Sequence, residues 1–263
     1  MKSFSCRLLG TASGIPTKTR NNVSTVLDVN NDYYILDAGE QCAASMLRNG
    51  LDYNKVKAIF ISHMDVDHFA GLPMLVKSMI LWARRQTPLQ LFVPRDAVAD
   101  VKNCLAMMYL VDKALGFRLD ILPLSEEFEY RDANISMTFH GNRHIKNRFC
   151  RNPALKDRYP DLQKESFSFC IQLKNRKMVY SGDLACPEEM DAFINDTDIL
   201  LCELAHFTPE TLFQYISAKN VKRTICLHFH PDWDDRDAEL LELAEKYGIS
   251  NIEMGRDGLQ INF

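Results

Sequence analysis

Four residues that can bind metal ions lie within the six-residue segment 63–68. They are His63, Asp65, Asp67 and His68, in the sequence SHMDVDHFAGLP of residues 62–73. The apolar run KAIFIS before them is typical of a buried strand. Because side-chain direction alternates along a strand, residues 63 and 65 share one side, and the following turn can direct Asp67 and His68 to a second position. This spacing predicts ligands for two adjacent metal ions, although such clusters also occur in exposed polar turns.

Further candidates follow other apolar strands of the predicted fold. His144 comes after a predicted strand at 135–140, Asp183 ends one at 177–182, His228 ends one at 222–228, and Asp37 ends one at 33–37. Each of these residues alone is more often a turn residue or a hydrogen-bonded polar group. Since loops at strand ends commonly carry function, their shared placement favours one site.

The order of these segments resembles the metallo-β-lactamase superfamily. The segments are DAGE (37–40), HMDVDH (63–68), His144, SGD (181–183) and LHF (227–229). The opening LGTASGIP (9–16) and the run LCELAH (201–206) are similar to its ribonuclease Z-like and phosphodiesterase branch. The resemblance extends over nearly the whole chain. It implies a four-layer αβ/βα sandwich of the α/β (α+β) class, in a single hydrolase domain of residues 1–263.

The same resemblance implies a dinuclear metal site. One metal ion would be held by His63, Asp65 and His144, the other by Asp67, His68 and His228, with Asp183 bridging them. Asp37 would lie behind the ligands and orient the 63–68 loop by hydrogen bonds, as outer carboxylates commonly do.

The chain departs from the superfamily at Asp65, where the commonest form has histidine. Carboxylate is a competent ligand, so we expect the site to be retained. An extra hard oxygen ligand favours Mn²⁺ or Fe²⁺ relative to a site richer in histidine. Zn²⁺ is the default expectation, and elemental analysis of the native protein would decide between zinc and mixed metallation.

Two metal ions roughly 3.5–4 Å apart can lower the pKa of a bridging water towards neutrality. The resulting hydroxide would attack phosphorus or a carbonyl carbon, and we expect Asp67 to orient that water or accept its proton. Glu203 and His206 resemble the pair that assists the leaving group in the ribonuclease Z-like branch. That branch commonly has histidine immediately before the glutamate, and here Cys202 stands there.

A basic arm points to a phosphate-bearing substrate. Residues 143–164 contain seven Lys and Arg against Asp157 and Asp161, on a chain of net charge −4. A small phosphodiester, such as a cyclic nucleotide, is favoured over RNA because no separate RNA-clamping insertion is visible. A solvated charged loop is an equal alternative for the arm. The candidate substrate contacts are Lys18, Arg20, Arg143, Lys146, Arg148 and His230.

Other functions stay open for the same residues. A lactone, thioester or β-lactam hydrolase would use the same site on a carbonyl centre, and a ribonuclease Z-like endonuclease would use it on RNA. A non-hydrolytic metal-binding protein is a further alternative. A diiron redox protein is another, since carboxylate at position 65 also occurs in that branch, but no flavin-binding partner domain is visible.

Alternating strands and helices must position these residues. The pattern predicts strands at 3–9, 23–29, 33–37, 57–62, 89–94, 119–124, 128–132, 135–140, 166–173, 177–182, 198–204, 222–228, 251–254 and 258–262. It predicts helices at 40–49, 69–85, 95–110, 187–194, 209–219 and 235–247, and no element in the polar stretch 142–164. Mixed meander and βα units of this kind favour sheets inside and helices outside.

The bulk composition is that of an ordinary globular protein, with 46% hydrophobic and 25% charged residues. The net charge argues against a general nucleic-acid coat or a polybasic membrane binder. No apolar run reaches the roughly 18 residues of a membrane span. Eight cysteines without a CxxC pair predict reduced, buried thiols in a cytoplasmic protein, with a disulfide framework or cysteine metal site as the alternative. A homodimer is compatible with all of this.

Overall fold

The computed structural model describes residues 4–159, 162 and 164–262. These residues form two compact units, one of residues 4–124 and 256–262 and the other within 125–255. The single domain predicted for 1–263 stays a prediction. Across the described chain, no helix combines the length and apolarity needed to cross a membrane.

The first unit is built on a seven-stranded sheet in the order β14-β1-β2-β3-β4-β5-β6. Its pairs from β14 to β3 are antiparallel, and those from β3 to β6 are parallel. The strands are β1 (Phe4–Gly10), β2 (Ser24–Val29), β3 (Asp32–Ala38), β4 (Val56–Phe60), β5 (Leu89–Pro94), β6 (Leu119–Leu124) and β14 (Gln260–Asn262). The helices are α1 (Cys42–Arg48), η1 (Tyr53–Lys55), α2 (Val66–Phe69), α3 (Leu72–Leu81), η2 (Arg95–Ala97), α4 (Val98–Met107) and α5 (Asp112–Leu115).

The second unit repeats this plan with the order β13-β12-β11-β10-β9-β8-β7. Its pairs from β13 to β10 are parallel, and those from β10 to β7 are antiparallel. The strands are β7 (Glu129–Arg131), β8 (Ser136–Gly141), β9 (Phe167–Leu173), β10 (Arg176–Tyr180), β11 (Ile199–Leu204), β12 (Thr224–Phe229) and β13 (Ile252–Met254). The helices are α6 (His144–Arg151), α7 (Pro153–Arg158), η3 (Pro187–Met190), α8 (Pro209–Ser217), η4 (Pro231–Trp233) and α9 (Asp237–Lys246).

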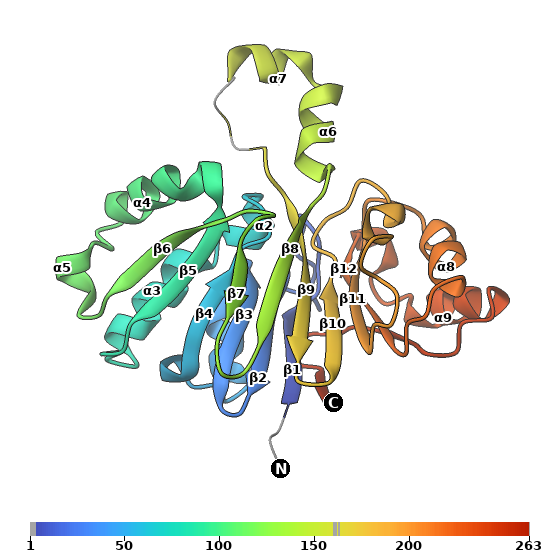
Figure 1. Ribbon diagram of the computed structural model, residues 1–263, viewed down its shortest axis with the longest axis horizontal. Helices are drawn as coiled ribbons and strands as arrows, with labels where there is room; N and C mark the ends of the chain where they lie inside the picture. Colours follow the sequence, from blue (N-terminus) through green and yellow to red (C-terminus); the bar gives the residue numbers. More distant parts are fainter. Residues whose placement is uncertain (1–3, 160–161, 163, 263) are drawn as a thin grey trace. The chain divides into compact units, whose positions relative to one another are not determined.

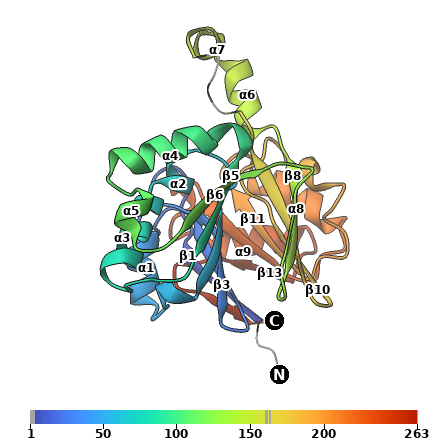
Figure 2. The same ribbon diagram turned by 60° about the vertical axis from the view of Figure 1, so that its left-hand side comes forward.

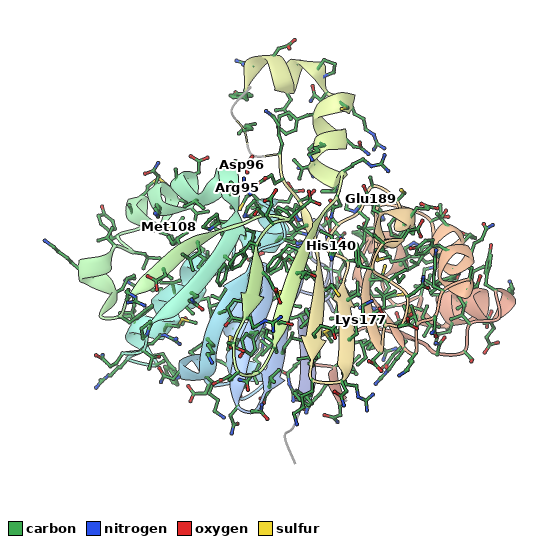
Figure 3. All side chains as sticks on the ribbon, viewed as in Figure 1. Arg95, Asp96, Met108, His140, Lys177 and Glu189 are labelled. Carbon is green, nitrogen blue, oxygen red and sulfur yellow. The ribbon has the colours of Figure 1, made fainter. Side chains whose placement is uncertain are left out.

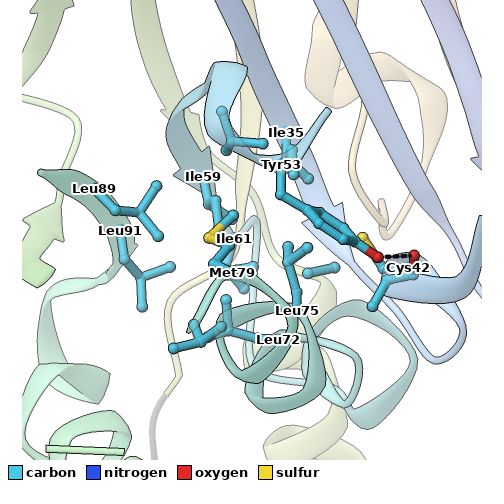
Figure 4. Close-up of a cluster of buried hydrophobic side chains, with 14 of the residues drawn as sticks. Ile35, Cys42, Tyr53, Ile59, Ile61, Leu72, Leu75, Met79, Leu89 and Leu91 are labelled. Carbon is cyan, nitrogen blue, oxygen red and sulfur yellow. Dashed lines mark hydrogen bonds between the residues drawn. The ribbon is translucent and has the colours of Figure 1, made fainter. Parts of the chain in front are cut away.

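Each sheet buries an apolar face under helices of its own unit. In the first unit, Ile59 and Leu91 from the strands pack with Leu75 and Met79 of α3, as Figure 4 shows. Figure 2 shows α1, α3 and α4 on one side of this sheet. In the second unit, Leu200 and Cys226 belong to a core with residues of α8 and α9, which lie beside β11 and β12 in Figure 1. The α/β class predicted from the sequence is confirmed.

Most strand predictions agree with the structure to within about two residues, but two helical predictions need correction. The predicted helix 69–85 is shortened to α3, which spans residues 72–81. It starts later than predicted because Gly71 donates its N–H to Ala38 O at 2.8 Å, which holds the chain against β3 and separates α3 from the one-turn helix α2. The predicted helix 187–194 is only the short turn η3, after which the chain reaches the left-handed Asp196 at φ 58°.

The polar stretch 142–164, for which no element was predicted, contains α6 and α7, which extend beyond the ends of β8 and β9 in Figure 1. Helix α6 forms because Ile145 and Phe149 stand four residues apart and bury one face. Asp161 and the side chain of Lys156, which belong to the predicted basic arm, lie outside the described residues.

Two glycines allow the metal-ligand segment to approach β3 closely. A Cβ atom on Gly71 would lie 2.0 Å from Gly39 O, and one on Gly39 would lie 2.3 Å from Asp67 O. Side chains at either position would therefore push the 63–71 segment away from the strand.

A buried hydrogen bond within the first core offers a test of this packing. The Tyr53 hydroxyl donates to Ala43 O at 2.6 Å, and Tyr53 is 1% exposed (Figure 4). Tyr53→Phe leaves that carbonyl without its donor, so we expect a loss of about 1–3 kcal/mol in the free energy of unfolding. The measurement is the midpoint of urea unfolding. Tyr109→Phe, at a side chain that is 84% exposed, is the control. Equal midpoints for both variants and the wild type would contradict the expectation.

Candidate metal centre

The ligand-bearing residues of the first unit follow β3 and β4, which pair in parallel. Asp37 comes near the end of β3, and Ser62 and His63 follow β4. Because parallel neighbours end at the same edge of a sheet, these residues meet there. Asp37, His63 and His68 are fully buried, and Asp67 is nearly so.

Asp37 organises this edge through its carboxylate. Oδ1 accepts from Ser62 N at 2.7 Å, and Oδ2 accepts from Ser62 Oγ at 2.8 Å. Oδ2 also lies 2.7 Å from His68 Nδ1. A carboxylate can only accept, so His68 carries its proton on Nδ1 and has its lone pair on Nε2. Ser62 Oγ in turn lies 3.0 Å from His63 Nδ1, so one carboxylate orients both imidazoles.

The remaining ring nitrogens of this segment face carboxylates. His68 Nε2 lies 3.4 Å from Asp67 Oδ2, and His63 Nε2 lies 3.5 Å from Asp65 Oδ2. The two imidazole rings are 4.0 Å apart between centroids. Four nitrogen and oxygen ligands are thus gathered on one short segment.

The second unit gathers its own set at the ends of the parallel strands β10, β11 and β12. Asp183, His228 and Glu203 are almost completely buried. His228 Nε2 lies 3.3 Å from Asp183 Oδ1, and His144 Nε2 lies 3.8 Å from Asp183 Oδ2. Asp183, Glu203, His206 and His228 each offer one ligand atom within 4.8 Å of the others, which suits a divalent ion.

Glu203 is the buried carboxylate of the second unit. It accepts from the backbone N–H groups of Leu184, Ala205 and His206 at 2.8, 3.0 and 3.1 Å. His206 Nδ1 lies 3.0 Å from Oε2 and therefore donates to it. Burial raises the pKa of Glu203, but the hydrogen bond with His206 and the nearby His228 imidazole outweigh it and bring the pKa to about 2. Burial lowers the pKa of His206, and the neighbouring Glu203 carboxylate raises it above its ordinary value.

Two of the site residues have left-handed backbone conformations. Asp37 has φ 56° and His228 has φ 54°, and each lies where the register of its strand shifts. Non-glycine residues adopt this region at a cost of about 1–3 kcal/mol, and such strain is concentrated at functional sites. The bulges turn both side chains out of the regular alternation.

The structure gives several predicted substrate residues other contacts. Arg20 is 5% exposed and donates from Nη1 to Thr11 Oγ1 at 2.9 Å, so it stabilises the loop after β1. The N–H and Nε of Arg143 both lie 2.9 Å from Glu189 Oε1. His230 accepts from Asp232 N at 3.3 Å and lies on the surface, as do Lys18 and Lys146. Arg148 lines a pocket beside His144 and His206.

Sequence reasoning missed Glu189. Its other carboxylate oxygen accepts from Ala185 N at 2.8 Å, so it joins the segment after Asp183 to the start of α6, near which Figure 3 labels it. Nothing in the pair of glutamates at 188 and 189 distinguishes this residue from a solvated charge. His140, which Figure 3 also labels, stacks on Phe193 with ring centroids 4.1 Å apart.

All eight cysteines are free thiols, and five of them are buried. Burial raises the pKa of the Cys226 thiol to about 12, so this side chain behaves as a small apolar residue.

Comparison with known proteins places the chain among metallo-β-lactamase folds. A family model described as anti-Pycsar protein Apyc1 matches residues 4–246. A ribonuclease Z of Picrophilus torridus is 24% identical over 302 residues, which cover 99% of this chain and 96% of that relative. The metallo-β-lactamase fold protein YhfI of Bacillus subtilis has a TM-score of 0.76 at 13% identity, with full coverage of both chains. Zn²⁺-bound PqqB of Methylobacterium extorquens has a TM-score of 0.74 at 15% identity, covering 98% of this chain and 100% of that one. The predicted superfamily and its fold are confirmed.

The role of Asp37 generates a prediction about metal affinity. Asp37→Asn keeps the shape of the side chain but removes the charge and an acceptor from the hydrogen bonds to Ser62 and His68. We expect zinc affinity to fall about 10–100-fold, as is usual when a residue that orients ligands is changed. The measurement is competition with a chromophoric chelator. Asp28→Asn changes a carboxylate of the same kind that accepts from Asn31 N in the turn after β2, and it serves as the control. Unchanged zinc affinity in a folded Asp37→Asn protein would show that Asp37 does not orient the ligands.

Proposed function

The chain belongs to the family of the anti-Pycsar protein Apyc1, and on that premise we propose that it is a dinuclear metal-dependent hydrolase. Its substrate would be a small phosphodiester such as a cyclic nucleotide. The observation that carries the proposal is the repeated design of the two units. In the first unit, the buried Asp37 carboxylate holds His68 so that its Nε2 faces Asp67. In the second unit, the buried Glu203 carboxylate accepts from His206 and lies 3.7 Å from Nδ1 of His228, whose Nε2 faces Asp183.

The ligand set fits divalent metal ions. We assign His63, Asp65 and His144 to one ion, and Asp67, His68 and His228 to the other, with Asp183 shared. Imidazole nitrogens and carboxylate oxygens suit zinc, manganese and iron alike. Asp65 adds an oxygen ligand where the superfamily commonly has histidine, so manganese or iron is proposed beside zinc.

Bound metal ions would supply a water of lowered pKa and stabilise negative charge on the attacked phosphate. Asp67 would orient that water and accept its proton. His206 would deliver a proton to the leaving oxygen, because Glu203 holds its Nδ1–H and directs Nε2 away from the buried carboxylate. Glu203 is thus a positioning residue that acts through His206.

Phosphorus is the preferred centre of attack because basic groups adjoin the second unit's ligands. Arg148 Nη2 lies 3.3 Å from His144 Nε2, where it would meet the charge of a phosphate. The carbonyl centre of a lactone, thioester or β-lactam carries no such charge. The buried free thiols are consistent with the cytoplasmic location that we propose.

A ribonuclease Z activity is the second candidate. The near full-length match to ribonuclease Z of Picrophilus torridus supports it, and RNA presents the same phosphodiester chemistry. The two candidates differ in the size of the substrate and not in the site.

A substrate panel tests the proposal directly. We expect the purified protein to hydrolyse bis-p-nitrophenyl phosphate and a cyclic nucleotide, and EDTA to abolish both reactions. Asp67→Ala should abolish them too, in a protein whose circular dichroism spectrum is unchanged, because it removes a metal ligand and the proton acceptor. Full activity of Asp67→Ala in the presence of EDTA would rule out the site. Hydrolysis of a lactone or thioester alone would instead indicate a carbonyl hydrolase, and cleavage of precursor tRNA alone would instead indicate a ribonuclease Z activity.

The proton-donating role of His206 generates a second prediction. An alcohol leaving group needs a proton and p-nitrophenolate does not. We therefore expect His206→Ala to lower kcat about 10²–10⁴-fold for a cyclic nucleotide and only slightly for bis-p-nitrophenyl phosphate. The two substrates, measured on one preparation, control for loss of folded protein. Equal losses on both would show that His206 has a structural or ligand role instead.

A further inference from the structure

Glu189 connects the two chain segments that bring His144 and Asp183 into the second unit's ligand set. Its Oε1 accepts from the backbone N–H and from Nε of Arg143, both at 2.9 Å. Its Oε2 accepts from the backbone N–H of Ala185 at 2.8 Å. Arg143 directly precedes His144, and Ala185 follows Asp183 by two residues. One carboxylate therefore ties the backbone beside one ligand to the backbone beside the other.

The backbone of Glu189 is itself anchored in the apolar core. Glu189 lies in η3 between Pro187 and Met190, which are both buried. Residues three apart lie on the same face of a 3₁₀ helix, so these two fix η3 on the core of the second unit. Met190 belongs to the same apolar cluster as Leu184. The Glu189 side chain is 8% exposed, so its carboxylate is held in place and is not a mobile surface charge.

Asp183 and His144 depend on Glu189 to different degrees. Asp183 comes shortly after β10, and the N–H of the next residue, Leu184, also donates to Glu203 Oε1 at 2.8 Å. His144 instead begins α6, in the segment that extends beyond the ends of β8 and β9 (Figure 1). The position of Asp183 is therefore fixed by the strand and by Glu203, whereas that of His144 depends on how the start of α6 is held.

The two ligand atoms that Glu189 brings together are close enough to bind one ion. His144 Nε2 lies 3.8 Å from Asp183 Oδ2. Nitrogen and oxygen ligands lie about 2.0–2.2 Å from a zinc ion, so two atoms at this separation can share it. The pair is thus arranged for binding by contacts of the protein alone.

We propose that Glu189 is a positioning residue that holds His144 at the distance from Asp183 at which both bind one metal ion. The inference rests on the proposed function, because it takes His144 and Asp183 as ligands of that ion. Without the Glu189 contacts, the start of α6 must be ordered as the ion binds, and the cost of that ordering weakens binding. The loss falls on the ion that we assign to His144 and spares the other.

Zinc titration of the metal-free protein by isothermal calorimetry, with a competing chelator, tests the proposal. Glu189→Gln replaces one acceptor oxygen by a donor, so the side chain can no longer accept from both Arg143 and Ala185. We expect the affinity for one ion to fall about tenfold and that for the other less than about twofold. His144→Ala should weaken the same binding step, which identifies the step as that of the His144 ion.

The matched control is Glu188→Gln, at the neighbouring, exposed residue, which should bind both ions as the wild type does. Unchanged affinities in Glu189→Gln would overturn the proposal while the hydrolase assignment stands. An equal loss for both ions would overturn it too, because it would indicate a general loosening of the fold. An equal effect of Glu188→Gln would show that charge alone is responsible.

A second variant covers the case in which Glu189→Gln does not fold. Glu189→Asp keeps the charge but is one methylene shorter, so it cannot reach both segments, and we expect the same selective loss. Wild-type affinity of Glu189→Asp for both ions would contradict the positioning role. Wild-type protein that binds fewer than two divalent ions would instead overturn the proposed dinuclear hydrolase and this inference with it.

Discussion

A buried carboxylate must have its charge compensated on every side, and each unit of this protein uses that requirement to fix its histidines. Asp37 is fully enclosed and takes its hydrogen bonds from Ser62 and His68. Glu203 is equally enclosed and takes its own from the backbone that follows two strands and from His206. An unpaired charge at either place would cost several kcal/mol, so the loops can close only in the arrangement that orients the imidazoles.

Backbone strain supports the same arrangement. Asp37 and His228 are held in left-handed conformations at bulges, one in each unit. The parallel strands beside them are apolar and deeply buried, and this packing provides the stability against which the strain is held. Gly39 and Gly71 then let the 63–71 segment lie directly on β3. The positions of the metal-ligand side chains are consequently determined by the backbone of the sheets and less by contacts among those side chains.

The sequence predicted the strands well because their apolar runs are long and end at chemically distinctive residues such as His63, Asp183 and His228. The role of Asp37 in orienting the metal ligands was predicted only from the superfamily resemblance. The residues around position 37 in the sequence do not indicate that its carboxylate contacts Ser62 and His68. The sequence could not predict α6, whose two buried residues are a weak signal within a highly charged stretch. It also could not show that Arg20 contacts Thr11 and Arg143 contacts Glu189, whereas Arg148 lies beside His144, because residues distant in sequence decide most of what a charged side chain contacts. Whether the two ligand sets share one dinuclear centre stays a prediction.

Helices α6 and α7 lie in the segment that connects β8 to β9, two strands that pair antiparallel along their length. Antiparallel neighbours can be connected by a short hairpin, so the sheet does not require these two helices and does not fix their sequence. The metal-ligand side chains after β4 and β10 and within β12 are positioned by the sheets, whereas the exposed residues of α6 pack against nothing in the described chain that restricts their type; His144, Ile145 and Phe149 are its buried residues. Substitutions on the exposed face of α6 can therefore accumulate among related proteins without moving the metal-ligand side chains that the sheets position.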